Sequence, residues 1–85
     1  MLRVLVAAAM LLSAPIILAG PVNINTASEQ QLDEELLGVG QALARRIVRY
    51  REAHGPFRSP EEIQNVPYVG VKTFQKNRAD IRVRD

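Results

Sequence analysis

A short turn flanked by helix-favouring sequence occurs twice in this chain, and this repeat restricts the possible folds more than any other feature. The first copy is Gly38–Val39–Gly40, followed directly by Gln41–Ile47. The second copy, Tyr68–Val69–Gly70, begins 30 residues later and is followed by Val71–Lys76. A repeated helix–turn–helix unit of this length predicts two pseudo-symmetric helical hairpins that share one core.

The first 19 residues are expected to form a secretory signal peptide rather than part of the folded domain. Arg3 gives a positive start, Val4–Leu12 is an unbroken apolar run, and Ala19 supplies a small residue at the expected cleavage site. The alternative is an uncleaved anchor, because Val4–Val22 approaches the roughly 20 residues that a membrane-spanning helix needs. Either interpretation places the remaining domain, residues 20–85, outside the cytoplasm.

Size and charge limit what this domain can do. A domain of ~66 residues supports one small core. The chain contains no cysteine, which excludes disulfides and cysteine-based metal sites. Without Arg3, ten basic and nine acidic side chains remain, so the net charge is close to +1. Binding to a polyanion would therefore depend on where the charges lie rather than on the global field.

Capping and apolar spacing predict an all-α fold of four to five short helices. Thr26 and Glu29 have the spacing of a capping box before the first helix, and Ser59 and Glu62 have the same spacing before the third. Gly55 is expected to cap the end of the second helix. The predicted helices cover residues 27–35, 41–53, 60–65 and 71–78.

Apolar residues at helical spacing define the expected core of this fold. The tail is expected to lie back on the core through Ile81 and Val83. The other expected core residues come from all four helices and the loop after the second: Leu32, Leu36, Leu43, Ile47, Tyr50, Phe57, Ile63, Val66 and Phe74.

The two turns are candidate anion sites. A glycine-rich turn that opens a helix directs several backbone N–H groups at one anion, and nearby cations can reach adjacent phosphates. The alternative for the glycines is a tight turn with no ligand, and for the arginines a solvated helix face paired with acids. The candidates for binding a DNA backbone are Gly38, Val39, Gly40, Arg45 and Arg46 from the first unit, and Val69, Gly70, Lys72 and Lys76 from the second.

These motifs resemble the helix-hairpin-helix domain of the competence protein ComEA family. The resemblance runs from Val22–Ala27 through Ile47–Glu52 and His54–Phe57 to Val69–Thr73 and Lys76–Arg78, nearly the whole predicted domain. It implies a tandem helix-hairpin-helix fold that binds the phosphate backbone of DNA, double-stranded DNA in particular, without sequence preference. It further implies a periplasmic role in the uptake of transforming DNA, with the uptake machinery as a possible partner.

Two positions depart from the family pattern. Tyr68 stands where the family has the first glycine of the second turn, and a positive φ there would strain a tyrosine. Its ring would either block the approach of a strand or stack on a sugar or base. Leu37, just before the first turn, would present an apolar tip if it is exposed.

Other function classes are weighed by the remaining polar residues. His54 has no nearby nucleophile or second metal ligand and is expected to cap a helix, so we expect no enzyme, no cofactor and no small-molecule substrate. The acidic run Asp33–Glu35 would repel DNA. It favours the alternative of an exported structural or protein-interaction module, as in a lumenal photosystem II subunit that carries helix-hairpin-helix pairs. Basic residues clustered on the hairpin face would favour DNA, and interleaved acids a protein partner.

Overall fold

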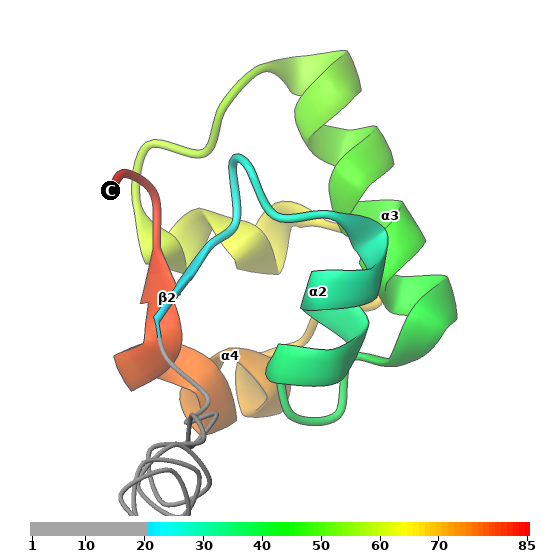
Figure 1. Cartoon of the computed structure of the whole chain (residues 1–85), viewed down its shortest axis with the longest axis vertical. Coiled ribbons are helices and arrows are strands. Elements are labelled where there is room, and N and C mark those ends of the chain that lie inside the picture. Colours follow the sequence, from blue (N-terminus) through cyan, green and yellow to red (C-terminus); the bar gives the residue numbers. More distant parts are fainter. Residues whose placement is uncertain (1–20) are drawn as a thin grey trace, which may run out of the picture.

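Helices form most of the chain that the computed structural model describes, residues 21–85 (Figure 1). The signal peptide predicted over residues 1–19 lies outside this range. The α-helices are α2 (Glu29–Glu35), α3 (Gly40–His54) and α4 (Val71–Asn77). Two 3₁₀-helices, η1 (Pro60–Asn65) and η2 (Arg78–Asp80), and two strands, β1 (Val22–Asn23) and β2 (Ile81–Arg82), complete the described part.

The elements form two consecutive helix–turn–helix units. α2 packs beside α3 in the first, and η1 contacts α4 in the second (Figure 1). The expectation of a mostly helical domain is confirmed. The third helical segment has the predicted bounds but is a 3₁₀-helix, and the fourth ends at Asn77, one residue before the predicted end.

The two ends of the domain are joined by a parallel strand pair that the all-α prediction did not include. Val22 is opposite Ile81 and Asn23 is opposite Arg82, and the Ile24 N–H donates to the Arg82 carbonyl at 2.9 Å. Ile81 is buried and Val83 packs against the core, so the predicted return of the tail is confirmed. The backbone groups of β2 pair with those of β1 because both segments are extended and lie over the same core residues.

Both predicted capping boxes are wrong in their hydrogen bonds. α2 begins at Glu29 rather than residue 27, because the Ser28 hydroxyl accepts from the Gln31 N–H at 3.1 Å. Thr26 lies in the preceding turn, where its N–H donates to the Asn23 carbonyl.

The segment before η1 also departs from the capping-box pattern. The Ser59 side chain makes no capping hydrogen bond, and its carbonyl accepts from the Glu62 N–H. The Glu62 carboxylate instead accepts from the Arg58 N–H at 2.9 Å. Pro60 at the first position fits η1 because its missing N–H would have had no partner there.

The core lies between the two helical units and under the strand pair. Gly55 ends α3 with a φ of 88° and donates to the Arg51 carbonyl, which confirms the predicted cap. Asn77 is the one buried polar residue within residues 21–85. The predicted core residues are buried (Leu32, Leu36, Ile47, Phe57, Ile63, Val66 and Phe74) or half-buried against the core (Leu43 and Tyr50).

No helix within residues 21–85 has both the length and the apolar character needed to cross a membrane.

Candidate functional site

The first turn places two glycines in a backbone conformation that other residues rarely adopt. α2 ends at Glu35 with Leu36 as its C-cap, and Gly38 and Gly40 follow with φ of 73° and 68°. Between them Val39 is buried and fixes the turn to the core. A Cβ added at either glycine would meet no atom within 4 Å, so the protein itself leaves this backbone uncovered. The glycines are required by conformation, and the turn remains accessible to another molecule.

A buried asparagine from the second unit holds the first turn in place. The Asn77 Oδ1 accepts from the Leu37 N–H at 2.7 Å, and Nδ2 donates to the Leu37 carbonyl at 2.9 Å. Nδ2 also donates to the Thr73 carbonyl at 2.8 Å within α4. Asn77 therefore ties the end of α4 to the residue just before Gly38. The Leu37 side chain is 63% exposed, as an apolar tip beside the turn would be.

The second turn repeats the first in outline but not in backbone conformation. Tyr68 has a φ of 74°, the counterpart of Gly38, and Val69 is buried like Val39. The predicted strain at Tyr68 is thus present, of the order of 1–2 kcal/mol for a left-handed non-glycine residue. The Val69 N–H donates to the Val66 carbonyl at 3.0 Å, so this amide is already used inside the turn.

Gly70 differs from its counterpart Gly40. Its φ of −95° and ψ of 178° are extended values that any residue can adopt, and a Cβ there would meet nothing within 4 Å. Neither conformation nor packing therefore requires glycine at position 70. What glycine does provide is a bare backbone directly before the first turn of α4.

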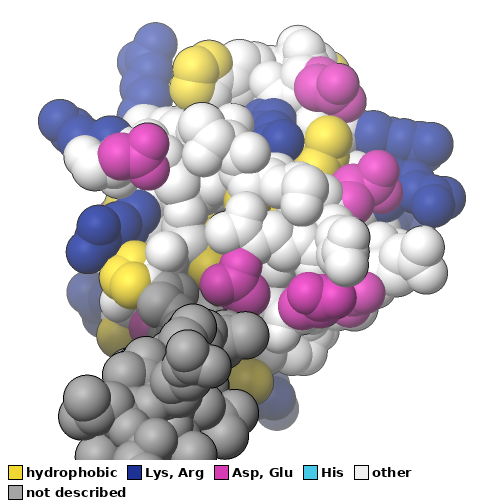
Figure 2. Space-filling model, in the orientation of Figure 1, with side chains coloured by type: hydrophobic (Ala, Val, Ile, Leu, Met, Phe, Trp, Pro, Cys, Tyr) yellow, Lys and Arg dark blue, Asp and Glu magenta, His cyan; other side chains and the backbone are white. Residues whose placement is uncertain are grey.

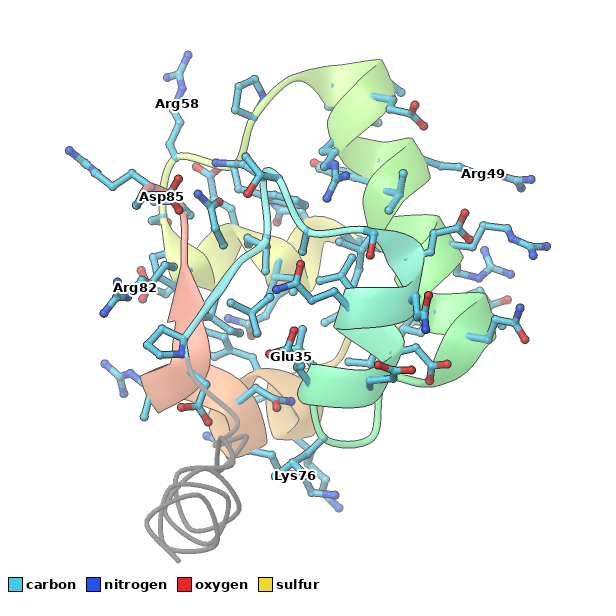
Figure 3. All side chains as sticks on the ribbon, viewed as in Figure 1. Glu35, Arg49, Arg58, Lys76, Arg82 and Asp85 are labelled. Atoms are coloured by element: carbon cyan, nitrogen blue, oxygen red, sulfur yellow. The ribbon has the colours of Figure 1, made fainter. Side chains whose placement is uncertain are left out.

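The four predicted cations lie in different surroundings. The Arg45 Nε forms an exposed ion pair with the Glu29 Oε1 at 3.1 Å. The Arg46 guanidinium carbon lies 4.4 Å from the centre of the Tyr68 ring, which brings a cation of α3 to the second turn. Lys72 lies exposed in the first turn of α4. Lys76 precedes Asn77 and points away from the molecule at the end where α4 meets the first turn (Figure 3).

A shallow groove of about 440 Å³ runs along α3 beside the second turn. We call it the α3 groove. Tyr50 and His54, which line it, are stacked with ring centres 4.1 Å apart. The other lining residues include three arginines and the residue before Tyr68: Arg45, Arg46, Arg49 and Pro67.

Acidic side chains gather over α2 on the face shown in Figure 2, while lysines and arginines lie around its edges. The sequence of α2, with Glu29, Asp33, Glu34 and Glu35, accounts for this concentration. Glu29 and Asp33 line a second hollow together with Arg45. Acids therefore interleave with the basic residues at Arg45, which lines both hollows, whereas Arg46 and Arg49 line the α3 groove alone.

Two polar residues in the last turn of α3 have structural roles. The His54 Nδ1 lies 3.1 Å from the Tyr50 carbonyl in the last turn of α3, as expected of a residue that caps this helix. Arg51 is half-buried and donates to the Ile24 carbonyl at 2.9 Å. It supports the segment after β1 rather than the turns.

Two asparagines that position the loops, Asn25 and Asn77, were not predicted from the sequence. The Asn25 side chain accepts from the Phe57 N–H at 2.7 Å and donates to the Phe57 carbonyl at 3.0 Å, the same two-bond contact that Asn77 makes with Leu37. The available signal for Asn77 was its place three residues after Phe74, on the apolar face of a predicted helix.

Comparisons with known proteins agree with this geometry. Residues 19–82 match the family model described as the helix-hairpin-helix motif. ComE operon protein 1 of Bacillus subtilis is 41% identical over 63 residues, 74% of this chain and 30% of that protein. This confirms the resemblance to the ComEA family.

Two further relatives show how widely the module occurs. An uncharacterized protein of Haemophilus influenzae is 40% identical over 65 residues, 76% of this chain and 58% of that protein. The transcriptional accessory protein Tex of Neisseria gonorrhoeae is 39% identical over 62 residues, 73% of this chain and 8% of that protein. The chain thus spans less than two thirds of each of these relatives.

Proposed function

This chain belongs to the helix-hairpin-helix family, and on that premise we propose that it binds the DNA backbone without sequence preference. It does so as a binding module and not as an enzyme, with no cofactor and no small-molecule substrate. Duplex DNA is the preferred form. The backbone N–H groups after each turn bind a phosphate, and side-chain cations add contacts to neighbouring phosphates.

The observation that carries this proposal is the uncovered glycine backbone at both turns. Gly38 and Gly40 have open space where a side chain would stand, and Gly70 has it without any conformational need for glycine. A bare backbone at a helix start lets a phosphate oxygen come within hydrogen-bond distance of main-chain N–H groups. A Cβ on Gly70 would stand in that space, so glycine there serves a partner rather than the fold.

We infer further that the two units act as a tandem pair, each with one phosphate. In the first, Gly38, Val39 and Gly40 present the backbone. In the second, the Val69 N–H is used by Val66, so the phosphate is bound by the N–H groups from Gly70 onward. The link from Asn77 to Leu37 supports joint action, because it fixes the first turn relative to α4.

Charge at the turns adds affinity but no sequence reading. Arg46, Lys72 and Lys76 are exposed and form no ion pair within residues 21–85, although the Arg46 guanidinium lies over the Tyr68 ring. Arg45 must first leave Glu29 or share its charge with it. Two to four neutralised phosphates would give weak binding by one domain. Many copies along one DNA would then be needed to hold it.

The cellular role we propose is retention of incoming DNA in the periplasm during natural transformation. It rests on the likeness to ComE operon protein 1 and on the signal peptide expected over residues 1–19. A retained leader would instead tether the domain to the inner membrane, facing the periplasm. The mass of the exported protein separates the two, since cleavage removes the leader.

Charge substitutions on opposite sides of the molecule test the DNA interface. Lys72→Gln and Lys76→Gln remove one charge each near the turns, and Arg58→Gln removes one at the far end of the molecule from Lys76 (Figure 3). We expect duplex affinity, measured by fluorescence anisotropy at low salt, to fall several-fold for each lysine variant and to change less than about 2-fold for Arg58→Gln. Equal losses in all three variants would show that only net charge matters and would refute the interface.

A second candidate function is a protein-interaction module. The observation that favours it is the pairing of Arg45 with Glu29, beside the acidic side chains of α2. The exposed Leu37 and Val71 side chains would add apolar contacts. Failure of the whole domain to bind DNA at low salt would favour this candidate.

A further inference from the structure

Tyr68 is an exposed aromatic residue that the fold does not require. It is the one non-glycine residue with a positive φ within residues 21–85, and its side chain is 80% exposed. Glycine would adopt this backbone without strain, and the ring contributes nothing to the buried core. Backbone strain that another residue type would avoid is common at functional sites. Compared with glycine, tyrosine at position 68 adds an exposed aromatic ring.

The surroundings of the ring suit a negatively charged chain with flat groups. The Arg46 guanidinium carbon lies 4.4 Å from the centre of the Tyr68 ring. Because Arg46 also lines the α3 groove, its positive charge lies where the groove meets the ring. Pro67, directly before Tyr68 in the chain, lines the groove. Arg49 also lines it and adds a second positive charge along α3. No aspartate or glutamate lines this groove among the described residues.

We propose that the second turn and the α3 groove bind single-stranded DNA. An unpaired base stacks on the face of the Tyr68 ring opposite the Arg46 guanidinium, and the phosphates that follow it run along Arg46 and Arg49. Base-paired DNA cannot use the ring in this way, because its bases are already stacked on one another. The inference rests on the proposed function, and it adds a contact that distinguishes frayed or single-stranded segments from intact duplex.

The test compares Tyr68→Gly with Tyr68→Phe in the whole exported domain. The probe is a short single-stranded oligonucleotide carrying 2-aminopurine, an adenine analogue whose fluorescence is quenched by stacking, and an intact duplex of the same sequence serves as the second ligand. Base–aromatic stacking is strong enough that its removal should weaken single-strand binding roughly 5- to 150-fold. Thermal unfolding of both variants checks the fold, with midpoints expected within about 8 °C of the parent.

The expected result is selective. Tyr68→Gly should lose single-strand affinity and 2-aminopurine quenching while duplex affinity changes less than about 3-fold, and Tyr68→Phe should keep both. Unchanged single-strand affinity in Tyr68→Gly, or an equal loss for both ligands, would overturn the stacking site, whereas the duplex affinity of the parent domain tests the proposed function separately. Absence of binding of the parent domain to either ligand would instead refute the proposed function itself.

Discussion

Asn77→Ala is the substitution whose effect on stability follows most directly from the structure. The side chain is 2% exposed and makes three hydrogen bonds, two to the backbone of Leu37 and one to Thr73. Each hydrogen bond contributes about 0.5–1.5 kcal/mol net, so their loss should cost about 2–4 kcal/mol. A domain of this size has a total stability of about 3–10 kcal/mol. The substitution should therefore remove a large share of the free energy of unfolding.

Thermal unfolding followed by far-UV circular dichroism measures this effect. A cost of about 2–4 kcal/mol corresponds to a midpoint lowered by roughly 10–30 °C in a domain of this length. Gln75→Ala, on the exposed face of the same helix, is the matched control and should change stability by no more than about 0.5 kcal/mol.

The unfolding temperature and the DNA affinity of Asn77→Ala together test the role of Asn77. If Asn77→Ala unfolded at the same temperature as Gln75→Ala, the account of Asn77 as the link between α4 and the first turn would be refuted. If it unfolds early, the remaining folded protein should also bind DNA less tightly below the transition, because Leu37 and the adjacent glycines lose their support.

Three further substitutions give separate tests. Gly70→Ala should leave stability unchanged or raise it by about 0.4–1 kcal/mol, since the backbone there suits any residue and a Cβ meets no atom. The same substitution should weaken DNA binding in the anisotropy assay. Unchanged affinity would mean that Gly70 touches no phosphate. Asn25→Ala removes three hydrogen bonds, two to Phe57 and one to the Val83 carbonyl, and should cost about 2–4 kcal/mol in urea unfolding. A cost near zero would contradict its structural role. Glu29→Gln breaks an exposed ion pair that contributes no more than about 1 kcal/mol to stability. Because the substitution releases Arg45, it should raise DNA affinity a few-fold. Unchanged DNA affinity would place Arg45 outside the interface.

The parts of the fold that sequence predicted well depend on local patterns. Apolar spacing located Leu32, Ile47 and Phe74 in the core, because each lies on a helix with one clear apolar face. Gly55 followed by Pro56 marked the end of α3 to within one residue. These features depend on neighbours within a turn or two of the chain.

The parts that sequence missed depend on contacts between distant segments. The strand pair joins Val22 to Ile81, and nothing in either segment alone specifies that partner. The Thr26 capping box failed because Asn23 accepts the Thr26 N–H and draws that residue into the preceding turn. Asn77 was missed for the same reason, since its partner Leu37 lies 40 residues away.

The candidate site was predicted in composition but not in arrangement. The first turn was located because glycine adopts a positive φ without strain, as at Gly38 and Gly40. The pairing of Arg46 with Tyr68 and of Arg45 with Glu29 depends on how α3 packs against the second turn and against α2. Those contacts are set by tertiary packing, which the periodicity of one helix does not encode.

The salt dependence of duplex binding shows whether this domain binds the phosphate backbone of DNA. The domain of residues 20–85 would be titrated with random-sequence duplex DNA by fluorescence anisotropy over a series of salt concentrations. Contacts with two to four phosphates predict sequence-independent binding whose log K falls against log salt with a slope of about −2 to −4. Absence of binding at low salt, or binding whose slope is near zero, would contradict the account.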